Sequence, residues 1–144
     1  RFAAAIDAFG SSTGWWNRLL GLGEDEQRLN LKKEGIFPLV HGVRSLALAH
    51  RVTETSTAGR ITALVAGGHL AADMGADLTD SLHFFMGLRL KAGLAELDTG
   101  KPVTGAVDLA RLSSLDRDLL KDTLGVVKRF KALLRHRFHL EGAR

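Results

Sequence analysis

The sequence contains no cysteine and no tyrosine, and only two prolines interrupt its 144 residues. The absence of cysteine excludes disulfides, thiolate metal sites, cysteine-ligated iron–sulfur clusters and cysteine nucleophiles. Its longest apolar stretch, residues 61–72, is broken by Gly67, Gly68 and His69. That stretch is shorter than the roughly 18 residues a membrane span requires. Because a lack of cysteine suits a reducing compartment, we expect a cytoplasmic protein that has an apolar core and no membrane association.

The composition is that of a globular protein with a modest positive charge. Apolar residues make up 45% and charged residues 25% of the chain, whose net charge is +4. A chain of this length predicts one domain, and a mildly basic balance favours anionic partners without requiring nucleic acid. Because the chain starts at Arg1 without an initiator methionine, we expect a fragment of a longer protein. The expected organisation is a single helical domain over residues 1–144, with residues 1–28 as an N-terminal helical segment.

Apolar residues recur at helical spacing nearly throughout, and strand-like alternation over four or more residues is scarce. The pattern therefore predicts an all-α fold, a helical bundle of about five helices with a long C-terminal helix. The expected helices are residues 2–9, a helix from Pro38 to Val52, a short one around residues 61–65, one that opens at 77–80 and ends at Gly100, and one of about 25 residues from Ser113.

The helix that opens at residues 77–80 carries an apolar stripe and two glycines. We expect the stripe to be buried, because its members share one helical face. They are Leu82, Phe85, Met86, Leu90 and Leu94. Gly87 and Gly93 lie in the same helix, where each costs about 1 kcal/mol relative to alanine. That cost indicates a packing reason, so we expect a neighbouring helix to approach closely there.

The sequence offers no self-contained active site. Neither Gly21-Leu22-Gly23 nor Gly67-Gly68 is followed by the glycine and lysine pattern of a phosphate-binding loop. His136 and His139 lie three residues apart, but no third ligand is spaced to complete a zinc site. The serines lie mostly at expected caps and turns, where hydroxyl groups accept backbone hydrogen bonds. We therefore expect no catalytic residue, no metal site and no cofactor in this chain.

The basic residues are more informative. Arg44 and Arg89 are each flanked by apolar residues of a predicted helix, so we expect both near the buried edge of a stripe. Arginine is rarely buried without a partner such as a carboxylate, a helix C-terminus or a ligand anion. An internal salt bridge and a phosphate- or carboxylate-binding patch both remain open on this reasoning. The basic stretch at 128–138 is amphipathic rather than a base-stacking platform, which does not favour nucleic-acid binding.

Residues 29–48 read Leu-Asn-Leu-Lys-Lys-Glu-Gly-Ile-Phe-Pro-Leu-Val-His-Gly-Val-Arg-Ser-Leu-Ala-Leu. This block resembles the pattern hydrophobic-Asp-Leu-Lys … Gly … Pro-Ile-Val … Arg … Leu-Ala-Leu of a bacterial family, the nucleotidyltransferase substrate-binding domain. Asn30 stands where the family usually has Asp. Three later stretches resemble the family in the same order: Thr57-Ala58-Gly59-Arg60-Ile61, the stretch 82–90 with its final Leu88-Arg89-Leu90, and the closing helix over residues 112–138. Together these stretches cover most of residues 29–140.

The resemblance implies a helical C-terminal module that follows a nucleotidyltransferase domain of the protein-uridylyltransferase kind in the same chain. Cystathionine-β-synthase-type and cyclic-nucleotide-binding domains often lie upstream in such signalling proteins. The implied role is non-catalytic, namely binding or positioning a protein or nucleotide substrate, and the sequence has no Gly-Ser closely followed by Asp-x-Asp. The positions within the resembling blocks make Lys32, Arg44, Arg60 and Arg89 the candidate substrate-binding residues for an anionic group.

The alternative is a protein-interaction or dimerisation module that relays regulatory signals and has no small-molecule site. Glycines and small residues in the helix over residues 82–97 would allow two copies to pack closely as a homodimer. The long terminal helix offers a second docking face. Both functions remain open at the level of the sequence.

Overall fold

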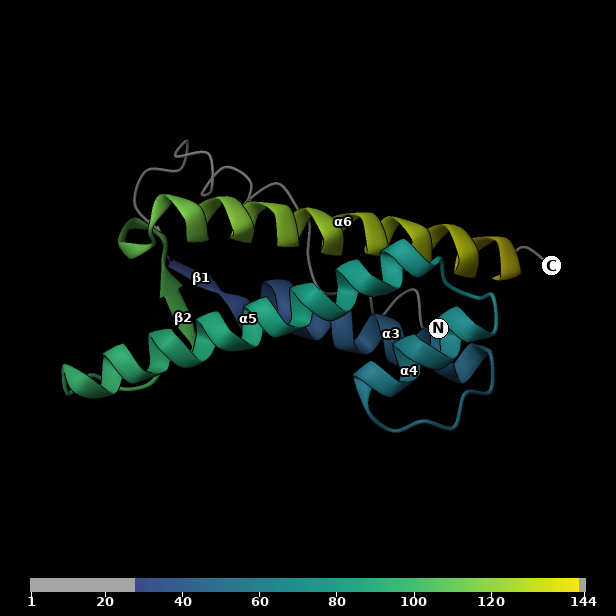
Figure 1. Cartoon of the computed structure of the whole chain (residues 1–144), viewed down its shortest axis with the longest axis horizontal. Helices are drawn as coiled ribbons and strands as arrows, with labels where there is room; N and C mark the ends of the chain where they lie inside the picture. The colour runs from purple at the N-terminus through teal and green to yellow at the C-terminus, as the bar shows by residue number, and fades with distance from the viewer. Residues whose placement is uncertain (1–27, 143–144) are drawn as a thin grey trace.

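The computed structural model describes residues 28–142, and these residues are mostly helical (Figure 1). In chain order the elements are β1 (Arg28–Asn30), the π-helical turn η1 (Lys32–Ile36), α3 (Phe37–Ala49), α4 (Thr57–Ala66), α5 (Ala72–Asp98), β2 (Ala106–Asp108), the 3-10 turn η2 (Leu109–Arg111) and α6 (Ser114–Gly142). The predicted all-α fold with a long C-terminal helix is confirmed. Four α-helices lie within the described residues, and the helix predicted over residues 2–9 lies outside them.

The start of α3 agrees with the prediction, because Pro38 lies in its first turn. Proline is tolerated there since its missing N–H would have no helical partner. The turn before it, η1, is absent from the prediction: the Phe37 N–H donates to the carbonyl of Lys32, five residues earlier, as in a π-helix. The Asn30 Oδ1 accepts a hydrogen bond from the Lys33 N–H at 3.2 Å. Asparagine therefore serves here as a helix cap, a role that aspartate also fills well.

The starts of α4 and α5 agree with the prediction in part. Ser56 caps α4, since its Oγ accepts a hydrogen bond from the Gly59 N–H at 3.0 Å. However, α5 begins at Ala72, several residues before the predicted start at 77–80. The earlier start has its own carboxylate, because the Asp73 Oδ1 accepts a hydrogen bond from the Met74 N–H near the positive end of the helix.

Two short strands that the sequence analysis missed form an antiparallel ladder. Leu29 of β1 lies opposite Val107 of β2, and both side chains are buried. Each strand has three residues, which is too short for the alternation that identifies a strand in a sequence. The ladder ties the segment before α3 to the connection between α5 and α6.

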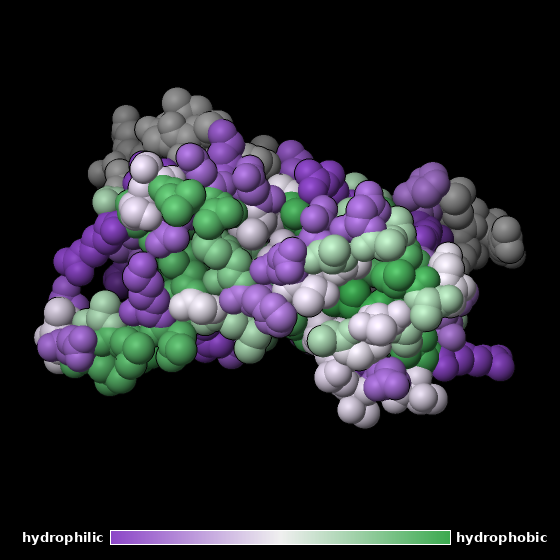
Figure 2. Space-filling view, viewed as in Figure 1, coloured by the Kyte–Doolittle hydropathy of each residue, from purple (hydrophilic) through white to green (hydrophobic). Residues whose placement is uncertain are grey.

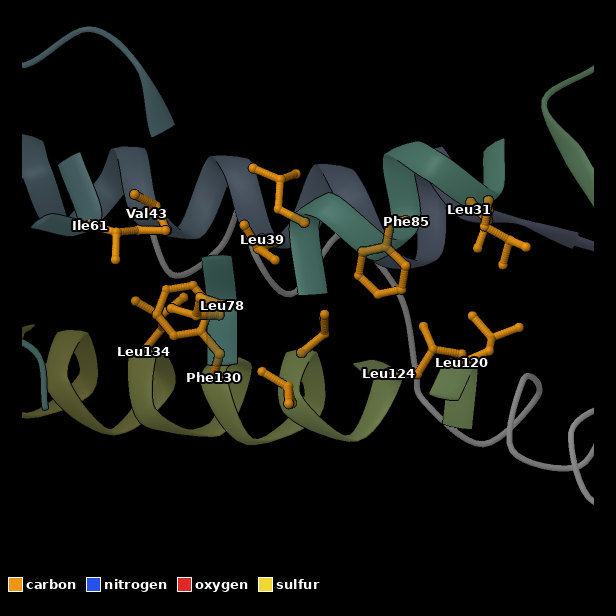
Figure 3. Packing of buried hydrophobic residues seen from close by; sticks show 14 of the residues in the cluster. Leu31, Leu39, Val43, Ile61, Leu78, Phe85, Leu120, Leu124, Phe130 and Leu134 are labelled. Carbon is orange, nitrogen blue, oxygen red and sulfur yellow. The ribbon is translucent and has the colours of Figure 1, made fainter. Parts of the chain in front are cut away.

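Apolar side chains from all four helices meet in one core (Figure 3). The helices approach closely where a glycine faces a neighbour. A Cβ atom on Gly42 of α3 would lie 2.7 Å from the Phe130 Cε2 of α6. A Cβ atom on Gly75 of α5 would lie 2.6 Å from the Val65 Cγ2 of α4. These small residues therefore set the distances between the packed helices.

The long helix α6 packs along α3 and α5 and begins as predicted. The Ser113 Oγ accepts a hydrogen bond from the Asp116 N–H at 3.1 Å, as expected for a capping residue. Near its other end, Arg137 donates a hydrogen bond to the carbonyl of His69 and so ties α6 to the turn before α5. Among the described helices, none combines the length and the apolar character needed to cross a membrane.

The expected buried stripe of α5 is only partly buried. Leu82 and Phe85 lie in the core, whereas Met86, Leu90 and Leu94 expose 55%, 64% and 53% of their surface. The reason is that α5 runs past α3 and α4, so that its last turns lie beside β2 (Figure 1). We refer to residues 72–88 as the inner part of α5 and to residues 89–98 as its outer part.

The expected packing reason for Gly87 and Gly93 is also wrong. A Cβ atom on Gly87 would meet nothing within 4 Å. A Cβ atom on Gly93 would meet only the Val103 Cγ1, at 3.7 Å, and Val103 belongs to a loop. Neither glycine therefore lies at a close approach of a described helix.

Candidate functional site

The basic residues predicted from the sequence lie on separate elements. They are Lys32 in η1, Arg44 in α3, Arg60 in α4 and Arg89 in α5. The Lys32 Nζ lies 4.9 Å from the ring centre of Phe37, which is a cation–π distance. The Arg60 Nε donates a hydrogen bond to the carbonyl of Glu54 at 2.9 Å. Two of the four predicted residues therefore have local partners within the protein.

Arg44 and Arg89 are both exposed, which corrects the expectation that they lie near a buried edge. On α3 the buried face contains Val43 and Leu46, and Arg44 falls outside it. Arg89 lies in the outer part of α5, next to Gly105. Neither arginine forms an ion pair or a hydrogen bond with another residue that the structure describes. The internal salt bridges considered above are therefore not formed within residues 28–142.

A cavity of about 420 Å³ opens between the outer part of α5, the β1–β2 ladder and the start of α6. Its volume falls in the range of small-molecule sites. Polar lining residues are Arg28, Lys91, Glu96, Thr99, Lys101, Asp108, Arg111, Ser113 and Asp116. None of the four sequence-predicted residues lines it. Figure 2 shows the hollow, with hydrophilic side chains around it, between the end of α5 and the start of α6.

The cavity is lined by four basic and three acidic side chains. Two of the basic side chains form ion pairs with two of the acidic ones. The Lys91 Nζ lies 3.4 Å from the Asp116 Oδ2, and the Arg111 Nε lies 3.7 Å from the Asp108 Oδ2. Both cations are largely exposed, so these pairs contribute little to stability and can open for a ligand. The remaining cations, Arg28 and Lys101, form no ion pair with a described residue. The cavity therefore retains net positive charge and favours an anionic group.

Glu96 adds an acceptor to this basic cavity. Its Oε2 accepts hydrogen bonds from the N–H and the hydroxyl of Thr104, both at 3.1 Å. Its Oε1 is buried and has no hydrogen-bond partner among the described residues. A buried acceptor without a donor is unfavourable by about 1–3 kcal/mol.

Sequence reasoning missed this cavity for a physical reason. Its charged residues come from β1, α5, the loop after α5, β2 and the start of α6. The ladder that pairs Arg28 with Asp108 joins segments far apart in the sequence. No local spacing reports such a pairing, and the only sequence signal is the presence of Lys91 and Lys101 near the end of a helix.

The described residues form a helical domain with a cavity that carries a net positive charge. The chain belongs to the family described as "Putative nucleotidyltransferase substrate binding domain", whose model matches residues 1–138. The match extends over nearly the whole chain and confirms the resemblance drawn from residues 29–48 and the later blocks. A search of curated proteins and a search of solved structures found no similar protein.

Proposed function

We propose that this chain is the non-catalytic substrate-binding domain of a cytoplasmic bacterial signalling protein. In that protein a nucleotidyltransferase domain lies upstream in the same chain, with cystathionine-β-synthase-type or cyclic-nucleotide-binding domains before it, and residues 1–144 form one helical domain. The cavity beside the outer part of α5 carries the proposal. Arg28 and Lys101 supply positive charge for an anionic group of the substrate, and Glu96 adds a carboxylate to the lining of the same cavity.

The placement of the acidic residues supports a non-catalytic role. The sequence Asp116-Arg117-Asp118 has the Asp-x-Asp spacing but lies in the first turns of α6. Residues two apart on a helix do not face each other, so these carboxylates cannot share one metal ion as a pair. Within residues 28–142, no three His, Asp or Glu residues are grouped to hold a metal ion. We therefore assign nucleotidyl transfer to the upstream domain.

Thermal unfolding and calorimetric titration with ATP, UTP and inorganic pyrophosphate test this proposal. A ligand at 100 times its Kd stabilises the folded state by about 2.7 kcal/mol. In a domain of this size we expect a rise in Tm of roughly 5–10 °C. Arg28→Ala and Lys101→Ala should each weaken binding roughly tenfold or more, because each removes a charged contact. Unchanged affinity in both variants, with the fold intact, would contradict the assignment of the cavity.

Lys32, Arg44, Arg60 and Arg89 remain a second proposal for the anion-binding residues. Arg44 and Arg89 are the informative pair, since neither has an ion-pair partner among the described residues. The double variant Arg44→Ala/Arg89→Ala leaves the cavity lining intact and is the matched control for the cavity variants. If this double variant loses binding and the Arg28 and Lys101 variants keep it, the anion site lies on that surface.

A further inference from the structure

The side of α5 that faces away from the cavity carries a row of exposed apolar side chains (Figure 2). We call this row the outer stripe. It consists of Met86, Leu90, Leu94 and Leu97 of α5 together with Val103 of the following loop, and these residues expose between 53% and 64% of their surface. A groove of about 340 Å³ runs along the stripe. The cavity is lined mainly by the opposite face of the same helix, and Lys91 lies at the edge between the two surfaces.

The outer stripe is large enough to form the centre of a stable interface. Five half-exposed apolar side chains present on the order of 500 Å², comparable to the largest apolar patch on a typical monomer. A specific interface buries roughly 800 Å² on each partner, including its polar rim. The stripe alone would supply roughly 500 Å² of that area, and the rest would come from flanking polar residues.

The stripe is self-complementary when two α5 helices run antiparallel. A two-fold axis near Leu94 sets Leu90 of one copy opposite Leu97 of the other, and the reverse contact follows by symmetry. On one flank of the stripe the same axis brings Lys91 close to Asp98 of the second copy, because helical periodicity puts both on that flank. Asp98 forms no ion pair with a described residue. The Lys91 side chain is 76% exposed and lies 3.4 Å from Asp116, an exposed pair that it would exchange for Asp98 of the second copy.

The glycines of this helix fit the same arrangement. A Cβ atom on Gly87 would meet nothing within 4 Å, and a Cβ atom on Gly93 would contact only Val103. Small residues on a helix face allow a second helix to approach closely. Gly93 lines the groove beside the leucines and so leaves room there for a second copy, whereas Gly87 lies outside the groove.

We propose that two copies of this chain associate through the outer stripe, with α5 of one copy packed antiparallel against α5 of the other. Charge complementarity and the size of the stripe favour a second copy over an unlike partner. The proposal does not depend on the cavity being the substrate site, because the apolar residues of the stripe lie outside the cavity lining.

Sedimentation equilibrium from micromolar to hundreds of micromolar chain tests the association. We expect the mass to rise from that of one chain to that of two. Leu94→Glu should weaken the association at least ~30-fold, since it puts a charge at the centre of the interface. The control is Leu115→Glu, which changes a leucine that is 68% exposed at the start of α6, outside the stripe. A wild-type chain that stays monomeric throughout, or an association that Leu94→Glu leaves unchanged, would overturn the proposal.

Charge reversal supplies a second variant in case Leu94→Glu fails to fold. Asp98→Lys changes an exposed residue and should weaken the association about fivefold, since it turns an exposed ion pair into repulsion at both symmetric positions. The double variant Lys91→Asp/Asp98→Lys should restore part of it, because Lys91→Asp also removes the ion pair with Asp116. Failure of the double variant to recover, with both proteins folded, would overturn the Lys91–Asp98 contact and with it the antiparallel arrangement.

The absence of cysteine allows a direct test of geometry by disulfide cross-linking. Leu94→Cys places a thiol near the two-fold axis, so mild oxidation should give a covalent dimer in high yield. Met86→Cys is the matched control, because an antiparallel pair separates the two copies of residue 86. Efficient cross-linking of Met86→Cys with little from Leu94→Cys would overturn the antiparallel arrangement.

Discussion

The inner and outer parts of α5 belong to one continuous helix and differ in what surrounds them. In the inner part, Leu78 and Phe85 are fully buried because α4 and α6 pack against that part of the helix. In the outer part, Leu90 and Leu97 are largely exposed, although they continue the same helical pattern. The comparison shows that helical periodicity identifies an apolar face but does not tell whether another element packs against it. The inner part contributes to the core, whereas the outer part lines the cavity on one side and carries most of the outer stripe on the other.

The largest expected difference between the two parts concerns truncation of a large apolar side chain. Phe85→Ala should lower the free energy of unfolding by about 3–5 kcal/mol, because it opens a cavity in the core. Leu94→Ala should change it by less than about 0.5 kcal/mol, because that side chain is half-exposed. Urea unfolding of both variants at low chain concentration measures the difference without a contribution from association. Equal destabilisation would contradict the division of α5.

Alanine substitutions of two glycines in α5 should change stability by smaller amounts and in opposite directions. In Gly75→Ala the new methyl group clashes with Val65, which costs about 1–3 kcal/mol and outweighs a gain in helix propensity of about 1 kcal/mol. In Gly87→Ala the methyl group meets open space, so only the gain remains. We therefore expect a lower Tm for the first variant and a higher Tm for the second. A change of Tm in the same direction in both variants would contradict the close contact at Gly75 or the open space at Gly87.

Much of the fold follows from the sequence, because its signals are local. Pro38 in the first turn of α3, the Ser56 cap of α4 and the Ser113 cap of α6 each depend on neighbours within a few residues. The start of α5 was placed too late, because Asp77 resembles a helix start although Asp73 already supplies the carboxylate.

The cavity could not be predicted from the sequence, because its residues meet through tertiary packing. Arg28 reaches it through the pairing of β1 with β2, two strands too short to show alternation. Glu96 is placed by hydrogen bonds to Thr104, across the turn at the end of α5. The exposure of Arg44 and Arg89 was missed for a related reason, since flanking apolar residues do not fix the direction of a helical side chain.

The most direct test of the central claim is hydrogen exchange along α5, measured by mass spectrometry at low chain concentration. We predict that the amides of residues 90–98 exchange about tenfold faster, or more, than those of residues 76–88, because fewer packed contacts oppose local opening. Raising the chain concentration, or adding a nucleotide that binds, should slow exchange in residues 90–98 only. Equal protection along the helix, or ligand protection confined to residues 76–88, would contradict the account.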